Sequence, residues 1–169
     1  IGHAFVEKII KMQKNNFLIT QNIDGLHQKS GIPRNKMIEI HGNAIEAACL
    51  ECGAKQNITD FHDAIKTKKQ LPRCTVCNGT VKVATISFGQ PMNEEDMEKA
   101  SNIVEDSDLM IVMGSSLKVL PAGKLPNLAM RSGSKLVILN REKTRYDSIA
   151  DMVINDELQN ICSGLLQKL

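Results

Sequence analysis

The chain has 169 residues, of which 42% are hydrophobic and 24% charged, so it is long enough for one main core with a small appended module. Its formal net charge of +2 is too balanced to indicate a nucleic-acid or membrane partner. The longest apolar run, "LMIVMG" at 109–114, is far shorter than the roughly 20 residues that a membrane helix needs. We therefore expect a globular protein without a membrane-spanning helix.

The first half of the chain alternates between a helix and short strands. Apolar residues recur at helical spacing over residues 5–12, and "KNN" follows as a plausible stop. "FLIT" at 17–20 predicts a short buried strand, and residues 21–31 mix amides, an acid and glycines, as a loop beyond a strand end does. "MIEIHGN" at 37–43 predicts another strand that runs into a turn.

The second half continues this alternation. The predicted elements are a strand at 84–89, a helix at 93–107 with acids in its first turn, a strand at 109–113 that ends in a small-residue loop, a helix at 121–133 with an interior proline, strands at 135–140 and 151–155, and a terminal helix with Leu158, Ile161, Leu165 and Leu169 on one face. Strands that alternate with helices predict an α/β fold with a doubly wound parallel sheet. Ligands in that architecture bind outside the carboxyl ends of the strands.

Four of the five cysteines form two C-x2-C pairs, Cys49 with Cys52 and Cys74 with Cys77. Four thiolates at this spacing favour a tetrahedral, closed, structural zinc site. The intervening segment is too polar to build its own core, so the metal would supply folding energy.

Two disulfides are the alternative interpretation of these cysteines. The absence of a secretory signal and an unpaired fifth cysteine, Cys162, favour zinc instead. Reduced thiols also favour an intracellular setting, cytoplasmic or nuclear. Nucleic-acid-binding ribbons use the same cage, so a binding module remains an alternative.

Two histidines follow predicted strand ends and are candidates for a general base. His27 lies in "QNIDGLH" and His41 in "EIHGN". A loop histidine taken alone is more often structural than catalytic, and His3 and His62 lie in predicted helices. "GSSL" at 114–117 and "LNRE" at 139–142 are weak signals of a nucleotide site.

Together these stretches resemble the sirtuins, the family of NAD-dependent protein deacylases. The matching motifs, in the family's order, are "TQNIDGLHQKSG", "EIHGN", the two cysteine pairs, "SFGQP", "MGSSLKVLPA" and "ILNRE". The resemblance implies a Rossmann-like domain over residues 1–45 and 85–169, with a zinc-binding module inserted at 46–84. It also implies that NAD and an acyl-lysine protein or peptide meet in the cleft between them.

The resemblance assigns roles to residues in these motifs. The catalytic residues would be His41, Asn22 and Asp24, with His41 as the base that accepts a proton from the ribose hydroxyls while the acyl group passes to ADP-ribose and nicotinamide leaves. The NAD contacts would be Gln21, Asn22, Asp24, Gly114, Ser115, Ser116, Val119, Asn140 and Glu142. The peptide contacts would be Ile86, Phe88, Gly89, Lys118, Val119 and Leu120, and the zinc ligands Cys49, Cys52, Cys74 and Cys77.

The sequence departs from the family pattern in two places. The family begins with a strand and a glycine-rich "GAGxS" turn that binds the NAD pyrophosphate, and neither occurs in these residues, which start without Met. We therefore expect an N-terminally incomplete chain. Gln90 stands where many relatives have Glu, a change at the rim of the peptide strand.

Two other functions remain open. The same cleft could serve a protein ADP-ribosyltransferase, in which another nucleophile captures the ribose carbon. The chain could also be a non-catalytic scaffold that binds NAD and zinc. The combination of His41, Asn22 and Asp24 favours the deacylase, and no membrane or direct nucleic-acid partner is expected.

Overall fold

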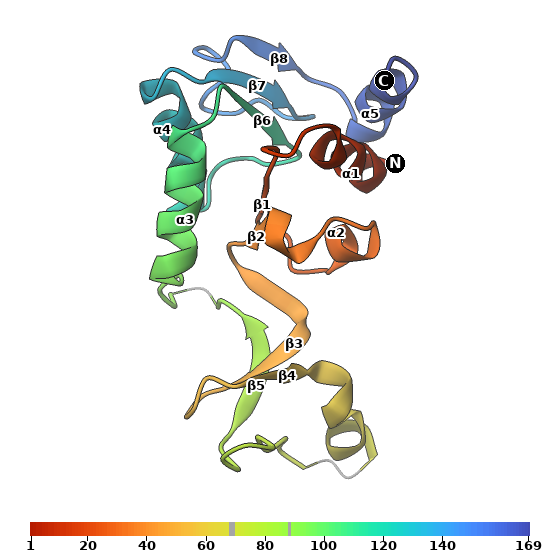
Figure 1. Cartoon of the computed structure of the whole chain (residues 1–169), viewed down its shortest axis with the longest axis vertical. Helices are drawn as coiled ribbons and strands as arrows, with labels where there is room; N and C mark the ends of the chain where they lie inside the picture. The colour runs from red at the N-terminus through yellow and green to blue at the C-terminus, as the bar shows by residue number, and fades with distance from the viewer. Residues whose placement is uncertain (68–69, 88) are drawn as a thin grey trace.

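The computed structural model describes residues 1–67, 70–87 and 89–169. It is elongated, with parallel strands and most helices at one end and an antiparallel sheet at the other (Figure 1). Phe88, a predicted peptide contact, lies outside the described residues.

The parallel strands form two small sheets. β1 (Leu18–Thr20) pairs with β2 (Met37–Glu39), with Leu18 opposite Met37. In the second sheet, β7 (Lys135–Leu139) lies between β6 (Leu109–Met113) and β8 (Met152–Ile154). All three pairings are parallel, which confirms the predicted α/β class.

Helices pack against these parallel strands. α3 (Glu94–Glu105) and α4 (Leu125–Arg131) lie side by side in Figure 1, and their apolar faces meet strand residues in one core. Asn93 caps α3, because its side chain accepts a hydrogen bond from the Asp96 amide. That core contains Ile38, Ile40, Ala100, Val104, Ala122, Leu125 and Ala129. At the opposite side, α1 (Gly2–Met12) lies next to α5 (Leu158–Leu166).

The antiparallel sheet has the strand order β4-β3-β5. β3 (Gly42–Cys49) is the long central strand, flanked by β4 (Lys55–Asn57) and β5 (Val81–Thr85). The short helices η2 (Ile58–Phe61) and η3 (Asp63–Thr67) follow β4. The core of this antiparallel part is small and consists of Ala47, Cys49, Phe61, Cys74 and Val81.

The structure differs from the sequence predictions at several element boundaries. The predicted loop at 21–31 contains a four-residue helix, α2 (Leu26–Lys29), and the strand predicted at 84–89 already ends at Thr85. Pro126 lies in the first turn of α4, after the short helix η4 (Ala122–Lys124), and not in a helix interior. That position suits proline because the first-turn N–H has no helical acceptor.

Within the described ranges, every helix is too short or too polar to cross a membrane.

Candidate active site and metal centre

His41 lies just beyond the end of β2, in the two-residue connection between β2 and β3. The Ile40 amide donates to the Thr20 carbonyl (3.0 Å), which extends the β1–β2 pairing and brings His41 beside the residues after β1. His41 Nδ1 lies 3.1 Å from the Gln21 carbonyl oxygen. Because a carbonyl oxygen only accepts, this contact assigns a proton to Nδ1, and the lone pair of the neutral ring is at Nε2.

The loop after β1 is ordered by its own polar side chains. The Asn22 amide donates to Thr20 Oγ1 (3.1 Å), and Asp24 Oδ1 accepts from the Leu26 amide (2.9 Å), which starts α2. Gly25 has φ +69, and a Cβ there would approach Ile45 Cγ2 to 2.9 Å. Asn22 and Asp24 are therefore held in an exposed turn beside His41.

A side-chain contact joins the ends of β1 and β6. Gln21 Nε2 donates to Ser115 Oγ (3.3 Å), and the same hydroxyl accepts from the Leu117 amide (3.2 Å). Two of the predicted NAD residues, 94 positions apart in the sequence, thus touch. Gly114 and Ser116 flank Ser115 on the exposed surface of this loop.

Asn140 organises the loop after β7. It is buried, its Nδ2 donates to the Glu142 carbonyl (2.6 Å), and its own carbonyl accepts from Asn155 Nδ2 (3.0 Å). The Glu142 side chain is exposed and pairs with Arg141 (3.4 Å). The sequence analysis did not select Asn155, because Asn155 and Asn140 become neighbours only when β7 and β8 pair.

The predicted peptide contacts among the described residues lie on two segments, half-buried Ile86 and exposed Gly89 after β5, and exposed Lys118, Val119 and Leu120 after β6. The Ile86 amide donates to the His41 carbonyl (2.9 Å), which places the residues after β5 next to the candidate base. Gln90 closes the turn that follows, since its Oε1 accepts from the Ser87 amide (3.3 Å) and from Lys82 Nζ (3.2 Å). On the second segment, Lys118 is exposed, as are the apolar side chains of Val119 (42%) and Leu120 (52%).

His27 is buried and contacts a second histidine. Its side chain is 8% exposed, and its ring centroid lies 4.6 Å from that of His3 on α1. Its Nδ1 is buried without a hydrogen-bond partner among the described residues. Burial, and next the charge of His3, lower the pKa of His27 below the ordinary value of 6.5, against a smaller opposing effect of Asp24.

This burial predicts acid sensitivity. Because the pKa of His27 is lower in the folded chain, the unfolded chain binds more protons below pH 6.5, and stability falls as the pH drops through that value. We expect His27→Gln to reduce the loss of thermal stability between pH 7 and pH 5.5. The control is His62→Gln, at an exposed histidine, which should lose as much thermal stability between these pH values as the wild type does. An equal loss in the wild type and in His27→Gln would contradict the prediction.

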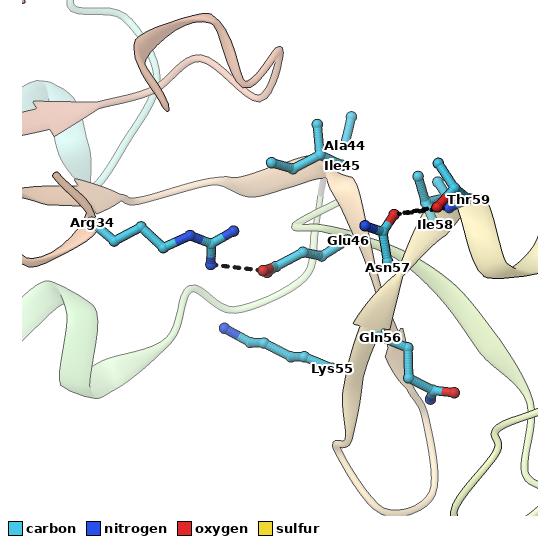
Figure 2. Close-up of a pocket in the computed structure, with 9 residues that line it drawn as sticks. All are labelled: Arg34, Ala44, Ile45, Glu46, Lys55, Gln56, Asn57, Ile58 and Thr59. Carbon is cyan, nitrogen blue, oxygen red and sulfur yellow. Dashed lines mark hydrogen bonds and ion pairs between the residues drawn. The ribbon is translucent and has the colours of Figure 1, made fainter. Parts of the chain in front are cut away.

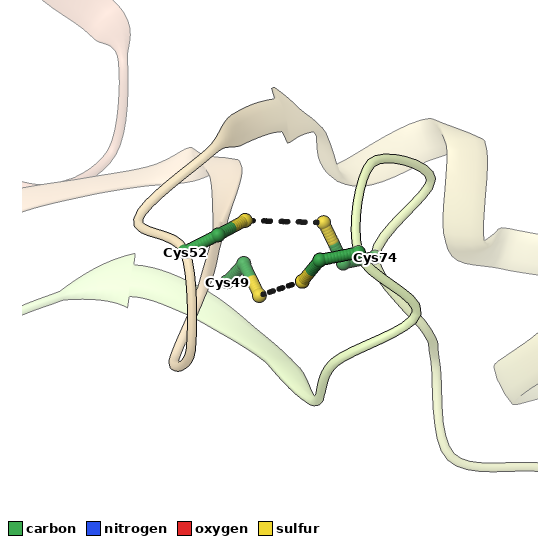
Figure 3. Close-up of side chains that lie close together, drawn as sticks. Cys49, Cys52 and Cys74 are labelled. Atoms are coloured by element: carbon green, nitrogen blue, oxygen red, sulfur yellow. Dashed lines mark hydrogen bonds between the residues drawn. The ribbon is translucent and has the colours of Figure 1, made fainter.

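The four paired cysteines converge at the end of the antiparallel sheet (Figure 3). Their Sγ atoms all lie within 4.8 Å of one another, with Cys49–Cys77 at 3.5 Å and Cys52–Cys74 at 3.7 Å. These distances are too long for disulfides, whose sulfurs lie about 2.05 Å apart. Four sulfurs about 2.3 Å from a tetrahedral zinc ion are about 3.8 Å from one another. The cysteines are therefore positioned to bind a metal such as zinc.

Hydrogen-bond donors surround these sulfurs. Backbone amides of Val76 and Gly79 donate to Cys74 Sγ and Cys77 Sγ, each at 3.4 Å. The pKa of the Cys74 thiol is lowered to about 6, mainly by hydrogen bonding from the Cys77 backbone. Burial has the next largest effect and raises the pKa, and hydrogen bonding from the Val76 backbone lowers it further.

Against hydrogen bonding from the Cys52 backbone, burial raises the pKa of the Cys49 thiol to about 12. Against hydrogen bonding from the Gly79 backbone, the side-chain hydrogen bond with Cys52 raises the pKa of Cys77. Of these three thiols, Cys74 is therefore the one shifted toward the thiolate form that metals bind.

Gln56 on β4 adds a side-chain donor that the sequence did not reveal. Its Nε2 donates to Cys74 Sγ (3.2 Å), while its Oε1 accepts from the amide and the hydroxyl of Thr75 (3.0 and 2.8 Å). The amide therefore ties β4 to the second cysteine pair.

Loss of this donor should weaken metal retention. We expect Gln56→Glu, which keeps the shape but replaces the donor with a negative charge, to speed zinc release to a chelator at least ten-fold, as outer-shell changes at metal sites do. The exposed Gln159→Glu on α5 makes the same charge change elsewhere and should have the wild-type rate. A wild-type release rate in Gln56→Glu would show that the contact does not matter to the metal.

A cavity of about 340 Å³ lies where η1 (Arg34–Lys36) meets β3 and β4 (Figure 2). An ion pair from Arg34 to Glu46 (2.7 Å) spans one side of it. Its lining residues are Arg34, Ala44, Ile45, Glu46, Lys55, Gln56, Asn57, Ile58 and Thr59. None of these was predicted to contact NAD or peptide, so this cavity is distinct from the candidate active site.

Comparison with known proteins agrees with this architecture. The model of the Sir2 family matches residues 1–121. The chain is 42% identical to an NAD-dependent protein deacetylase of Rhodopseudomonas palustris, over 93% of this chain and 62% of that protein. It is 45% identical to NAD-dependent protein deacetylase 1 of Bradyrhizobium diazoefficiens, over 93% of this chain and 61% of the relative. The chain thus spans somewhat less than two thirds of these relatives.

Solved structures show the same similarity in three dimensions. A structure described as Sir2 with p53 peptide and NAD⁺ superposes with a TM-score of 0.89 at 34% identity, covering 99% of this chain and 68% of that one. A structure of Sir2 bound to acetylated peptide gives a TM-score of 0.90 at 33% identity, covering 99% of this chain and 69% of the other. Since the family model and these relatives cover most of its length, the chain belongs to the Sir2 family, the sirtuins.

Proposed function

We propose that the protein is an NAD-dependent protein lysine deacylase, which transfers an acyl group to ADP-ribose and releases nicotinamide. The observation that carries this proposal is the placement of His41, whose Nδ1 is bound to the Gln21 carbonyl. That contact leaves Nε2 able to accept a proton beside the turn that holds Asn22 and Asp24. The relatives named NAD-dependent protein deacetylases, and the Sir2 structures with acetylated or propionylated peptide, support the same activity.

In this proposal the loops at the strand ends bind the nucleotide. NAD supplies the ribose carbon and hydroxyls to which the acyl group is transferred. Gln21, Asn22 and Asp24 line the nicotinamide and ribose side, and Asn140 with Glu142 the adenosine side. The small residues Gly114, Ser115 and Ser116 allow backbone N–H groups to approach phosphate and ribose oxygens, with Val119 beside the ribose. His41 takes the proton from a ribose hydroxyl.

The acyl-lysine peptide would lie as an added strand between two segments. Ile86 and Gly89 would form one side, and Lys118, Val119 and Leu120 the other. We also propose Phe88 for the first side, although it lies outside the described residues. Apolar Ile86 next to the His41 carbonyl would exclude water from the lysine stem, which favours attack by the weakly nucleophilic amide oxygen.

The division of the chain follows from the same proposal. Residues 1–45 and 85–169 would form the Rossmann-like domain, and residues 46–84 the zinc-binding module. Four thiolates leave no open position on a tetrahedral metal, so zinc would be structural and would take no part in the acyl transfer. Reduced thiols suit an intracellular protein, cytoplasmic or nuclear.

Product analysis tests the proposed function. The protein is expressed with its upstream coding sequence restored, purified and incubated with NAD and an acetyl-lysine peptide, and all products are followed by mass spectrometry. We expect nicotinamide, free lysine peptide and O-acetyl-ADP-ribose, none of which forms without NAD. ADP-ribose attached to protein, with the acetyl peptide intact, would show a transferase instead. Absence of NAD consumption would favour a scaffold.

A further inference from the structure

We propose that Asn43 is a positioning residue that holds His41 in place by clamping the carboxylates of Glu39 and Glu46. Glu39 is the last residue of β2, Asn43 and Glu46 lie on β3, and His41 lies in the turn between the two strands. The inference rests on the proposed function, because it concerns the residue that acts there as the base.

The Asn43 side chain is 4% exposed and is fully hydrogen-bonded. Its Nδ2 donates to Glu39 Oε2 (2.9 Å) and to Glu46 Oε2 (3.1 Å). Its Oδ1 accepts from the amides of Ile45 (3.2 Å) and Glu46 (2.9 Å). A primary amide has two N–H donors and two acceptor lone pairs, so all four are used.

Other elements hold the two carboxylates from outside. Gln28 on α2 donates to Glu39 Oε1, and Arg34 Nη1 on η1 donates to Glu46 Oε1 (2.7 Å). Asn43 is therefore the centre of a network that joins α2, η1, β2 and β3.

The amide also separates two like charges. Because both carboxylate oxygens accept from the same nitrogen, at 2.9 and 3.1 Å, they are at most about 6 Å apart, where two negative charges repel each other. Arg34 and Gln28 would still hold the outer oxygens, but loss of the amide would leave the two inner carboxylate oxygens without the donor that they share. Glu39 and Glu46 would then separate, and β3 would move relative to β2.

Such a movement would shift His41 relative to Gln21, because the turn that carries His41 is bonded to the residues after β5 on one side and to those after β1 on the other. The His41 carbonyl accepts from the Ile86 amide (2.9 Å), and its Nδ1 contacts the Gln21 carbonyl (3.1 Å). Gly42 follows with φ +71, and a Cβ there would collide with the Ala84 carbonyl oxygen, so the backbone has little room to compensate. A shift of β3 would therefore lengthen the Nδ1 contact that sets the tautomer.

An asparagine in a turn has an ordinary structural use, and the experiment must separate it from the clamp. Asn43 Oδ1 alone closes the turn over Ile45 and Glu46, and a serine hydroxyl can accept those hydrogen bonds as well. Serine cannot donate to two carboxylates at once. Asn43→Ser thus preserves the turn and removes the clamp, and the exposed Asn35→Ser is the matched control.

Two readouts are measured on the same proteins. Steady-state kinetics with NAD and an acetyl-lysine peptide should give a kcat at least ten-fold lower for Asn43→Ser, with KM for NAD within two-fold of wild type, since a small displacement of a catalytic group has effects of about this size or larger. Nitrogen-15 NMR of the imidazole should show the Nδ1–H form of His41 in wild type and a loss of that form in Asn43→Ser. Asn35→Ser should match wild type in both.

A wild-type kcat together with an unchanged His41 tautomer in Asn43→Ser would overturn the inference. Asn43→Asp, which keeps the side-chain shape and the acceptor oxygen but cannot donate to the two carboxylates, provides the same two readouts if Asn43→Ser does not fold, and a loss of kcat and of the Nδ1–H form at least as large is expected. An inactive wild type would refute the proposed function alone, because the tautomer measurement still decides whether Asn43 positions His41.

Discussion

Cys49→Ala is expected to lose the bound metal and to unfold the antiparallel sheet while the parallel sheets stay folded. Cys49 is buried in the core of that sheet, and the core has five members, of which Cys49 and Cys74 are themselves predicted ligands. So small a core cannot offset the conformational entropy of ordering the segment, which costs on the order of 1–2 kcal/mol per residue for the backbone alone. Metal binding therefore supplies a large share of its folding free energy.

Metal content and local protection measure this outcome. Elemental analysis should show about one zinc per wild-type chain and little in Cys49→Ala, and hydrogen exchange should become fast in β3–β5 but stay slow in β6 and β7. Cys162→Ala is the control, because Cys162 is buried on α5, away from the other four thiols. An unchanged zinc content in Cys49→Ala would refute the tetrathiolate assignment.

His41→Ala is expected to abolish deacylation and leave fold and metal intact. Removal of a general base lowers the rate by about 10²–10⁴-fold. Among the residues that the structure describes, the half-buried ring makes one polar contact, to the Gln21 carbonyl, so its loss should cost little stability. The readouts are O-acetyl-ADP-ribose formation, the melting temperature and the zinc content.

The control for this variant is His62→Ala, an exposed histidine beyond η2 that should behave as wild type in every readout. Full activity of His41→Ala would remove His41 from the role of base. A large drop in melting temperature would instead mean that the imidazole is part of the fold.

The parallel half of the molecule was predictable because its elements carry strong local signals. The apolar runs of β6 and β7 and the acidic first turn of α3 indicate their structure without reference to the rest of the chain. β3 and β4 were missed because they are poor in the β-branched and aromatic residues that indicate a strand: β3 has three alanines and one isoleucine, and β4 is polar. Their pairing with each other and with β5 depends on contacts that form only on folding. Local propensity carries little information where distant pairing decides the structure.

The candidate site shows the same division. Family motifs named Gln21 and Ser115, which the structure brings into contact. Asn43 and Gln56 were not singled out, because their partners are carboxylates and a sulfur that become neighbours only after folding. The "HGN" stretch does indicate a turn at Asn43, since an asparagine after a glycine is typical of a turn, but it does not indicate which side chains Asn43 contacts.

The antiparallel sheet leaves and rejoins the rest of the chain at one point. Gly42, where β3 begins, lies opposite Thr85, where β5 ends. A segment whose ends lie side by side can change length at its far end without displacing the structure that it interrupts. Insertions or deletions within η3, which has no buried residue, should thus be tolerated without displacing the turn that holds His41.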